Sequence, residues 1–468
     1  MSEQRVPPNE DEPYDPYAQQ VTTKPVSDFK SLANLVKSAV GTGLFAMPNA
    51  FASVGLVIGV IGTILMGVLI TGSLHILVKI HHKMCIHLRK PILHYDEVVV
   101  ASLTTSVQKS WMSTRVVTCI IHAAIIICYT GIGAIYVVFI SGIIQEFFDF
   151  EETIDQGYYA LILFPLFLAM NMIKHLYDIA VMSIIGNLLL FISALLGIIH
   201  ALKDGIGDKW HVIGPDVSLY PKFVGTVFFS MSSPGLILAL QHNMEKPWNF
   251  TKFTGVLNHG MAHITLLHTF VGVIGYLKWG TDSVGNFIRN QPVNDVPKIT
   301  ALTMQGLSIY FTYGLQCYMP IVILLEEYII PALNERSYIG TSFCWNMCIR
   351  FGITLMTCLL AAIIPKLDLF IAVVGAVCTS TLSTIIPITL YILVYRNNYG
   401  TLKWKLILGL SLLTVASIIT LCAIVVNLVL IIEFFRNSIE RITDLMKTQE
   451  KLQIAIYLQR KISSSAKG

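Results

Sequence analysis

Residues 55–80 read GLVIGVIGTILMGVLITGSLHILVKI, a run in which Lys79 is the single residue with a full formal charge. A helix needs about 20 mainly apolar residues to cross the hydrocarbon core of a bilayer, and this run is long enough. In hydrocarbon the backbone groups must bond within the protein, which restricts a span to an α-helix or a closed β-barrel. Because the run shows no alternation of polar and apolar side chains, a membrane-spanning helix is predicted.

The composition of the whole chain agrees with this prediction. The 468 residues are 54% hydrophobic and 13% charged, whereas about a quarter of the residues of a typical soluble domain are charged. The formal net charge of +4 is spread over many loops, so nucleic acid is not expected as a partner. The predicted fold class is an all-α polytopic membrane protein that lies in the lipid bilayer.

Apolar runs of this kind predict about eleven transmembrane helices. They lie at roughly residues 31–53, 55–80, 114–145, 158–173, 177–201, 222–243, 255–279, 299–325, 345–364, 369–395 and 404–433. Within a transporter domain of residues 30–433, we expect a first five-helix repeat (about 31–201), a second, inverted repeat (about 222–395) and one extra helix (about 404–433). The polar breaks at 174–178 and 365–368 are short, so a single bent element is the alternative at each of them.

The two ends of the chain differ from the apolar middle. Residues 1–29 are rich in proline and acidic side chains and poor in apolar ones, a composition typical of disorder. In residues 434–468, the apolar positions Phe435, Ile439, Ile442 and Met446 have the spacing of an amphipathic helix that lies on a surface. A merely solvated helix is the alternative for this tail.

Lys and Arg in the short connections predict the orientation. The 79–115 connection is rich in them, whereas the 146–155 connection is acidic and has none. Positive connections stay in the cytoplasm, so the first connection and the amino terminus are predicted to be cytoplasmic. Eleven crossings then place the carboxyl-terminal tail outside. Because that tail is basic, an even number of spans is the alternative.

Two predicted spans carry helix-breaking residues. Residues 38–48 in the first read SAVGTGLFAMP, and residues 229–235 in the sixth read FSMSSPG. Glycine and proline weaken or interrupt a helix. Interruptions at corresponding positions of two halves are typical of inverted-repeat transporters, in which the unwound backbone binds the substrate near the midplane. The alternative for each glycine is close helix packing.

A zwitterionic small molecule, most simply an amino acid, fits two such breaks. Its carboxylate would bind backbone amides at the start of a half-helix, where the helix dipole is positive, and its ammonium would bind carbonyls at the other break. The predicted substrate-binding residues are Gly41, Thr42, Gly43, Leu44, Phe229, Ser230, Met231 and Ser232. Tyr136 and Tyr313 are predicted to set side-chain specificity, with simple packing as the alternative.

Residues 35–48, LVKSAVGTGLFAMP, strongly resemble the opening helix of the proton-coupled amino acid transporter family, which belongs to the amino acid/auxin permease group. Further matching stretches, in the same order, are ILVK (76–79), Gly131 with YVVF (136–139), GYLKWG (275–280), FTYGLQ (311–316) and VGAVC (374–378). The resemblance covers roughly residues 30–430. It implies the leucine-transporter fold, uptake of small neutral amino acids toward the cytosol, and residence in the plasma membrane or the lysosomal (vacuolar) membrane.

Three positions that titrate in that family are neutral in this chain, namely Asn34, Ser232 and Gln241. A proton-coupled symport needs a group that binds and releases a proton, which amides and hydroxyls do not do near neutral pH. Protons nevertheless remain the candidate coupling ion, because other side chains could carry them. The proton-coupling candidates are His75, His122 and His263, with helix packing as the alternative for each. A facilitative carrier and an amino acid sensor with little flux are the alternative functions.

No other chemistry is indicated by the sequence. His259 and His263 lie four residues apart but lack an acidic or thiolate partner at matching spacing, so no metal site is expected. The nine cysteines fall inside predicted spans or face the cytoplasm, which predicts no external disulfide. Since the sequence contains no HExxH motif and no serine with a paired histidine, neither a cofactor nor an enzymatic activity is predicted.

Overall fold

The chain folds into a bundle of helices joined by short loops. The computed structural model describes residues 14–19, 25–39, 41–106, 113–148, 154–173, 176–203, 205–232, 234–292, 295–334, 339–396 and 403–465. Within these residues there is no strand, only one isolated parallel bridge between Val26 and Met244. The predicted all-α class is therefore confirmed.

The helical segments follow one another along the whole chain. The α-helices are α1 (Asp28–Ala39), α2 (Thr42–Val54), α3 (Leu56–Leu88), α4 (Tyr95–Ser106), α5 (Thr114–Phe148), α6 (Gln156–Ile162), α7 (Phe164–Asn171), α8 (Leu176–Lys203), α9 (Tyr220–Met231), α10 (Pro234–His242), α11 (Val256–Trp279), α12 (Val296–Val322), α13 (Ile330–Asn334), α14 (Ile339–Ile363), α15 (Leu367–Val374), α16 (Ile386–Val394) and α17 (Trp404–Ser465). Short 3₁₀ turns are η1 (Val217–Leu219), η2 (Pro247–Asn249), η3 (Gly280–Asp282) and η4 (Phe287–Asn290), and π-helical turns are η5 (Ile323–Ile329), η6 (Gly375–Thr379) and η7 (Thr381–Ile385).

Eight helical segments of the described part are long and apolar enough to cross a bilayer. They are Leu56–Leu88, Thr114–Phe148, Met182–Lys203, Val256–Asp282, Val296–Ala332, Cys344–Ile363, Leu367–Val394 and Leu406–Asn437. These segments make the chain an integral, multi-pass membrane protein. The other three expected spans coincide with pairs of shorter helices, α1–α2, α6–α7 and α9–α10. The total of eleven crossings and the inverted repeat stay predictions.

Several segments differ from the sequence-based boundaries. The short helix α4 lies in the basic connection, where no helix was expected, and the span expected at 158–173 is divided at Leu163 into α6 and α7. The helix expected to end near residue 325 continues through η5 and α13 to Asn334. The last helix does not end near residue 433 but runs on to Ser465, because the sequence after Gly409 contains no glycine or proline before Gly468.

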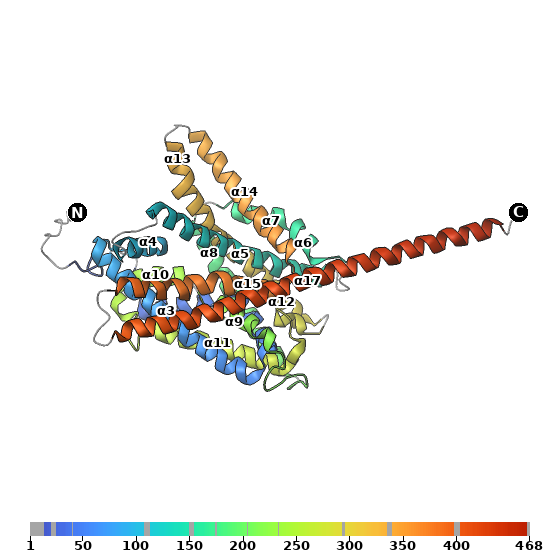
Figure 1. Ribbon diagram of the computed structural model, residues 1–468, viewed down its shortest axis with the longest axis horizontal. Helices are drawn as coiled ribbons and strands as arrows, with labels where there is room; N and C mark the ends of the chain where they lie inside the picture. The colour runs from blue at the N-terminus through green and yellow to red at the C-terminus, as the bar shows by residue number, and fades with distance from the viewer. Residues whose placement is uncertain are drawn as a thin grey trace.

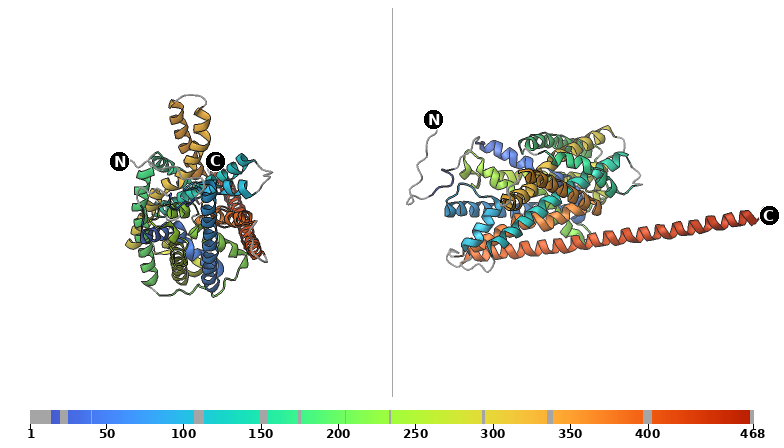
Figure 2. Two further views of the ribbon diagram at one scale, coloured as in Figure 1. Left: turned by 90° about the vertical axis from the view of Figure 1, so that its left-hand side faces the viewer. Right: turned by 90° about the horizontal axis from the view of Figure 1, so that it is seen from above.

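The long helices lie roughly along one direction, which is horizontal in Figure 1. Helices α4 and α10 lie at one end of the bundle, and the last part of α17 projects beyond the opposite end. Figure 2 shows that α13 and the beginning of α14 stand out from the side of the bundle. This arrangement gives the molecule two distinct ends, as a protein that crosses a bilayer requires.

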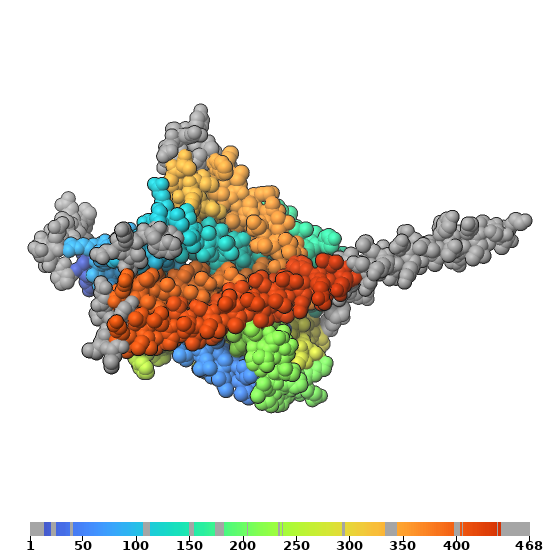
Figure 3. Space-filling view, viewed as in Figure 1, coloured from blue at the N-terminus to red at the C-terminus, as the bar shows by residue number. Residues whose placement is uncertain are grey.

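The surface of the bundle is apolar where it would meet lipid. Figure 3 shows α17 running across one whole face of the molecule. On this helix the side chains of Ile418 and Leu421 are each 62% exposed, and Val425 is 53% exposed. An apolar belt of this kind would associate or aggregate in water, whereas it needs no covering in hydrocarbon. The outer face of the bundle is therefore suited to lipid.

The interior contains two large apolar clusters, and α2 belongs to both of them. Met47 and Phe51 of α2 join a cluster formed mainly with α3, α4, α9 and α11. Leu44 and Phe45, at the beginning of α2, join a second cluster formed mainly with α5, α12, α14 and α15. The beginning of α2 therefore lies on the boundary between two separately packed parts of the bundle.

Candidate functional site

The first predicted helix break lies between α1 and α2. Helix α1 ends at Ala39, and α2 begins at Thr42, with Gly41 as its N-cap in an extended conformation (φ −124°, ψ −165°). The amide of Leu44 donates to the Gly41 carbonyl over 3.1 Å. The first amides of a helix have no partner within it, so the amides of Thr42 and Gly43 can bind an anion, and the α2 dipole favours one there. Thr42 is 2% exposed, which makes this a buried site.

The second predicted break separates α9 from α10. Helix α9 ends at Met231, and Ser232 has extended backbone angles (φ −105°, ψ 125°) while its amide still donates to the Phe228 carbonyl over 3.1 Å. Ser230 Oγ donates to the Thr226 carbonyl over 2.7 Å. The last carbonyls of a helix lack an intrahelical donor, so the end of α9 can accept hydrogen bonds from an ammonium group.

The two breaks come into direct contact. A methyl group on Gly43 would lie 2.7 Å from Ser230 Cα, so the backbones of α2 and α9 meet where only glycine leaves room. The positive end of α2 and the negative end of α9 are thereby brought together. The structure unites the predicted residues of both breaks, and it also shows that Gly43 serves close packing.

The π-helical turns η6 and η7 also pack against α9 and its end. Gly375, the first residue of η6, contacts the backbone of α9 at Gly225, and Ser383 of η7 donates from Oγ to Ser232 Oγ over 3.2 Å. Consecutive π-turns interrupt this span, and π-turns often mark functional sites. Sequence reasoning missed Ser383. The signal was the Ser/Thr-rich run TSTLST at 379–384, which is unusual in an apolar helix.

The predicted aromatic residues lie in different surroundings. Phe229 is partly buried, and Tyr136 of α5 accepts a long hydrogen bond of 3.5 Å from Gln316 Nε2 of α12. The side chain of Tyr313 is fully buried, its hydroxyl is 2.8 Å from Thr357 Oγ1, and its ring centroid is 4.6 Å from that of Phe167. These contacts tie α12 to α14 and α7, so they favour the packing interpretation for Tyr313.

The three predicted proton carriers lie apart from one another. His75 on α3 bonds through Nε2 to Asn258 Oδ1 over 2.7 Å. His122 on α5 bridges Asp96 Oδ2 at 3.2 Å and Tyr328 Oη at 3.1 Å.

The third candidate, His263, is exposed on α11, and its Nδ1 bonds to the His259 carbonyl over 2.6 Å. Sequence reasoning did not select His268, five positions further along α11, which is completely buried. Within the described residues, no three His, Cys, Asp or Glu side chains form a group that could hold a metal ion.

Gln241, near the end of α10, contacts a described part of the amino-terminal segment. Its Nε2 donates to Tyr17 Oη over 3.0 Å, and the Tyr17 ring stacks on His82 at a centroid distance of 4.6 Å. Burial raises the pKa of the Tyr17 hydroxyl, so this hydroxyl stays protonated at neutral pH. A short stretch of the segment predicted to be disordered, residues 14–19, is thus packed against α3 and α10.

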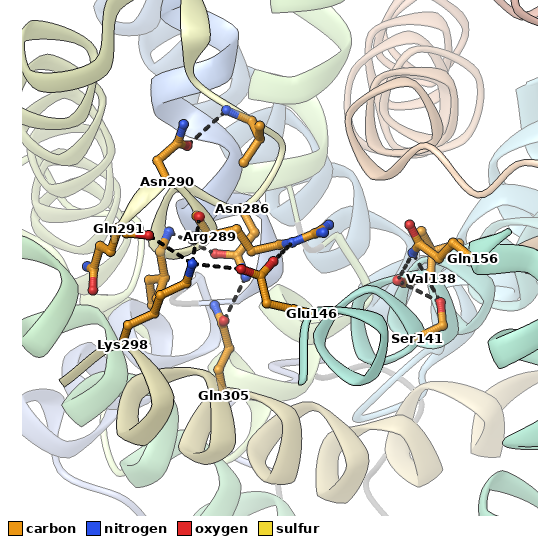
Figure 4. Close-up of polar contacts among 12 residues, drawn as sticks. Val138, Ser141, Glu146, Gln156, Asn286, Arg289, Asn290, Gln291, Lys298 and Gln305 are labelled. Carbon is orange, nitrogen blue, oxygen red and sulfur yellow. Dashed lines mark hydrogen bonds and ion pairs between the residues drawn. The ribbon is translucent and has the colours of Figure 1, made fainter. Parts of the chain in front are cut away.

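A buried ionic cluster lies at the opposite end of the bundle, where α5 ends and α12 begins (Figure 4). The carboxylate of Glu146 contacts Arg289 Nε at 2.8 Å and Lys298 Nζ at 2.6 Å. Lys298 also donates to the carbonyls of Arg289 and Gln291, at 3.1 and 2.8 Å. Because each charge has several partners, the cluster fixes the loop with η4 against two long helices.

Comparisons with known proteins identify the family of the chain. The family model described as "Transmembrane amino acid transporter protein" matches residues 24–433. The chain is 25% identical over 417 residues to the "Proton-coupled amino acid transporter-like protein pathetic" of Drosophila melanogaster, which covers 88% of this chain and 85% of the fly protein. It is 24% identical over 405 residues to the "Amino acid transporter AVT3C" of Arabidopsis thaliana, which covers 81% of this chain and 86% of the plant protein. Because the model spans most of its length, the chain belongs to the transmembrane amino acid transporter family.

Proposed function

We propose that this protein is a secondary transporter that moves small neutral amino acids toward the cytosol by alternating access, with protons as the coupling ion. The proposal rests on the family of the chain and on one observation, the contact between the two helix breaks at Gly43 and Ser230. One break presents the positive end of α2 and the other the negative end of α9. A zwitterion finds both of its partners there without a charged side chain.

The proposed substrate site consists of the residues predicted from the sequence, except that Gly41 serves as the N-cap of α2 and does not itself contact the substrate. The α-carboxylate binds the amides of Thr42 and Gly43 beside Leu44, whose own amide donates to the Gly41 carbonyl. The ammonium binds carbonyls at Phe229, Ser230 and Met231, with Ser232 beside them. A small side chain suits this site because the contact between α2 and α9 leaves little room. Preference for alanine, glycine or proline over larger amino acids follows from this geometry.

We propose that the gate is formed by Phe229 and Tyr136. Phe229 is partly buried beside the break, and it packs against the same apolar cluster that contains Tyr136 of α5. Closure of both rings over the substrate would separate it from water. Loss of uptake in Phe229→Ala and Tyr136→Ala would support this gate, and unchanged uptake in both variants would refute it.

We further propose the predicted topology, with eleven crossings, two inverted five-helix repeats and an extra helix. The amino terminus is cytosolic because the basic 79–115 connection, which contains α4, follows α3. Residues 30–433 form the transporter domain, and residues 1–29 and 434–468 are the terminal segments that flank it. The protein resides in the plasma membrane or the lysosomal membrane.

The decisive experiment measures uptake of labelled alanine, glycine and proline into proteoliposomes that contain the purified protein, with and without an inward proton gradient. Liposomes without protein are the control. Uptake that the gradient accelerates supports the proposal in full. An uptake rate that is the same with and without the gradient identifies a facilitative carrier, and binding without uptake identifies a sensor. The proposal is overturned if none of the three amino acids is bound or taken up.

A further inference from the structure

His268 is a buried histidine on α11 with one ring nitrogen that has no partner. Its side chain has no exposed area, and Nδ1 lies 2.8 Å from the Ile264 carbonyl oxygen. A carbonyl can only accept, so Nδ1 carries the hydrogen and Nε2 keeps its lone pair. Among the described residues Nε2 has no hydrogen-bond partner. An unsatisfied buried acceptor is destabilising, and in a native protein it calls for an explanation, which can be a bound water, a ligand or a chemical role.

The position of His268 along α11 matches the break between α1 and α2. Gly260 of α11 packs directly against Leu35 of α1, and further along α11 Gly275 packs against Pro48 of α2. These two contacts therefore occur in the same order along the α1–α2 segment as along α11. His268 lies about midway between the two glycines, on the same buried face of α11. The break lies between Leu35 and Pro48 in the chain, and His268 lies between their two contact points on α11, so we take this stretch of α11 to run past the break.

The other titratable groups near α11 lie away from the level of His268. Helix α11 packs against α1, α2, α3, α8 and η3. Helix α2 has no titratable side chain. The titratable side chains described on the remaining elements and on α11 itself are Asp28, Lys30, Lys37, His75, Lys79, His81, His82, Lys83, Cys85, His87, His200, Lys203, His259, His263, Tyr276, Lys278 and Asp282.

Contacts along each element place these groups. On α3, Gly67 packs against Thr265, and His75 bonds to Asn258, so His75 and the groups after it lie toward the beginning of α11. His200 and Asp282 lie at the other end of α11, in ion pairs with Asp295 and Lys209.

Asp28 and Lys30 begin α1 and His259 lies near the beginning of α11, at the end where Leu35 meets Gly260. Lys203 ends α8, and Tyr276 and Lys278 lie in the last turns of α11, at the opposite end.

Lys37 and His263 need a separate argument. Lys37 follows the α11-facing Leu35 by two residues, roughly 200° around α1, so it points to another side. His263 is exposed on α11 itself. His268 is thus the buried titratable side chain that α11 presents where it runs past the break.

We propose that Nε2 of His268 is the proton-binding atom of this transporter, and that the substrate carboxylate bound at the beginning of α2 is its counter-charge. This inference rests on the proposed transport function and names the residue that couples it to protons. It differs from the sequence-based candidates because Nε2 of His75 and Nε2 of His122 are already hydrogen-bonded to side chains, and His263 is exposed.

The step is a simple proton transfer. When the site opens to the acidic side, water delivers a proton and an N–H bond forms at Nε2, which gives an imidazolium. When the site opens to the cytosol, the proton returns to water and the neutral imidazole is restored. No other bond forms or breaks.

Coupling follows from the cost of the buried charges. A buried imidazolium without a counter-charge is strongly disfavoured, and so is a buried carboxylate. Packed helices have axes about 8–10 Å apart, so a proton on His268 and a carboxylate at the beginning of α2 stabilise one another. The coupling is reciprocal, and allosteric coupling of this kind changes affinity about 5- to 150-fold. Each ligand therefore binds best when the other is present.

The test compares His268→Gln with His263→Gln in proteoliposomes. The control is closely matched, because His263 is on the same helix and its Nδ1 also bonds to the carbonyl four residues earlier. Alanine uptake is measured with and without an inward proton gradient, and exchange of labelled for unlabelled alanine is measured at equal pH on both sides. Exchange needs substrate binding and alternating access but no net proton movement, so it shows that the variant is folded.

For His268→Gln we expect exchange to continue and the ratio of uptake with and without the gradient to fall to about 1, whereas His263→Gln should keep the wild-type ratio. A wild-type ratio in His268→Gln overturns the inference while the proposed transport function stands. Absence of both uptake and exchange in the wild-type protein overturns the transport function itself.

A measurement on the wild-type protein covers the case in which His268→Gln does not fold. Diethyl pyrocarbonate modifies neutral imidazole, and mass spectrometry of the peptides locates the modified histidines. Compared with the substrate-free protein at the same pH, saturating alanine should slow the modification of His268 and leave the modification rate of His263 unchanged. Modification of His268 should abolish the response to the gradient. Full gradient response with His268 modified overturns the inference.

Discussion

The contact between α2 and α9 predicts that Gly43→Ala impairs transport and that Gly41→Ala does not. The new methyl group at Gly43 would lie 2.7 Å from Ser230 Cα, whereas carbon atoms in ordinary contact are about 3.5–4.0 Å apart. The helices must therefore move apart by about 1 Å, and overpacking of this kind costs about 1–3 kcal/mol. At Gly41 a methyl group would meet no atom within 4 Å, and the backbone conformation suits alanine.

If the whole cost falls on the transporting conformation, alanine uptake by Gly43→Ala is about 5- to 150-fold slower, because 1.36 kcal/mol corresponds to a factor of ten in rate. Gly41→Ala should stay within about twofold of wild type. The assay is the initial uptake rate per reconstituted molecule, with gel filtration after heating as the stability measurement. Adding Ser230→Gly removes the Oγ and Cβ contacts and should recover part of the rate. Equal uptake by the two alanine variants would show that the helices do not meet at Gly43.

Two further substitutions test the packing around the site. Lys298→Met leaves the buried carboxylate of Glu146 with one cation fewer, so the free energy of unfolding should fall by about 3 kcal/mol. Lys209→Met removes one partner of an exposed ion pair and should lower it by less than about 1 kcal/mol. Equal shifts in thermal stability would contradict the burial of the cluster. Tyr313→Phe removes the hydrogen bond to Thr357, so the free energy of unfolding should fall by about 1–3 kcal/mol while the substrate preference stays unchanged. An altered preference among alanine, glycine and proline would instead place Tyr313 at the substrate.

The sequence could predict the spans and the two breaks because both signals are local. A run of apolar residues must lie in lipid wherever it occurs, and the glycines and prolines at 41–48 and 234–235 weaken a helix whatever surrounds them. The contacts of the site could not be predicted in the same way. That Gly43 meets Ser230, and that Ser383 reaches Ser232, depends on helices far apart in the chain.

The histidines show the same limit. In the sequence His263 and His268 look alike, two polar residues five positions apart on one apolar helix. Their difference comes from the neighbouring helices, because the helices packed on α11 bury the side chain of His268 and leave that of His263 exposed. A helix repeats every 3.6 residues, so a spacing of five places the two side chains on clearly different sides, but the pattern alone does not say which side is buried.

The packing also indicates which helices move together. Methyl groups at Gly272 and Gly275 of α11 would collide with Phe51 and Pro48 of α2, so these two helices interlock along their length. Tightly packed helices do not slide easily past one another. A motion that opens the break would therefore take α11 along with α1 and α2, and His268 would stay beside the carboxylate site in every conformation. The proton and the substrate would then be exposed to the same side at the same time, which is the condition for symport.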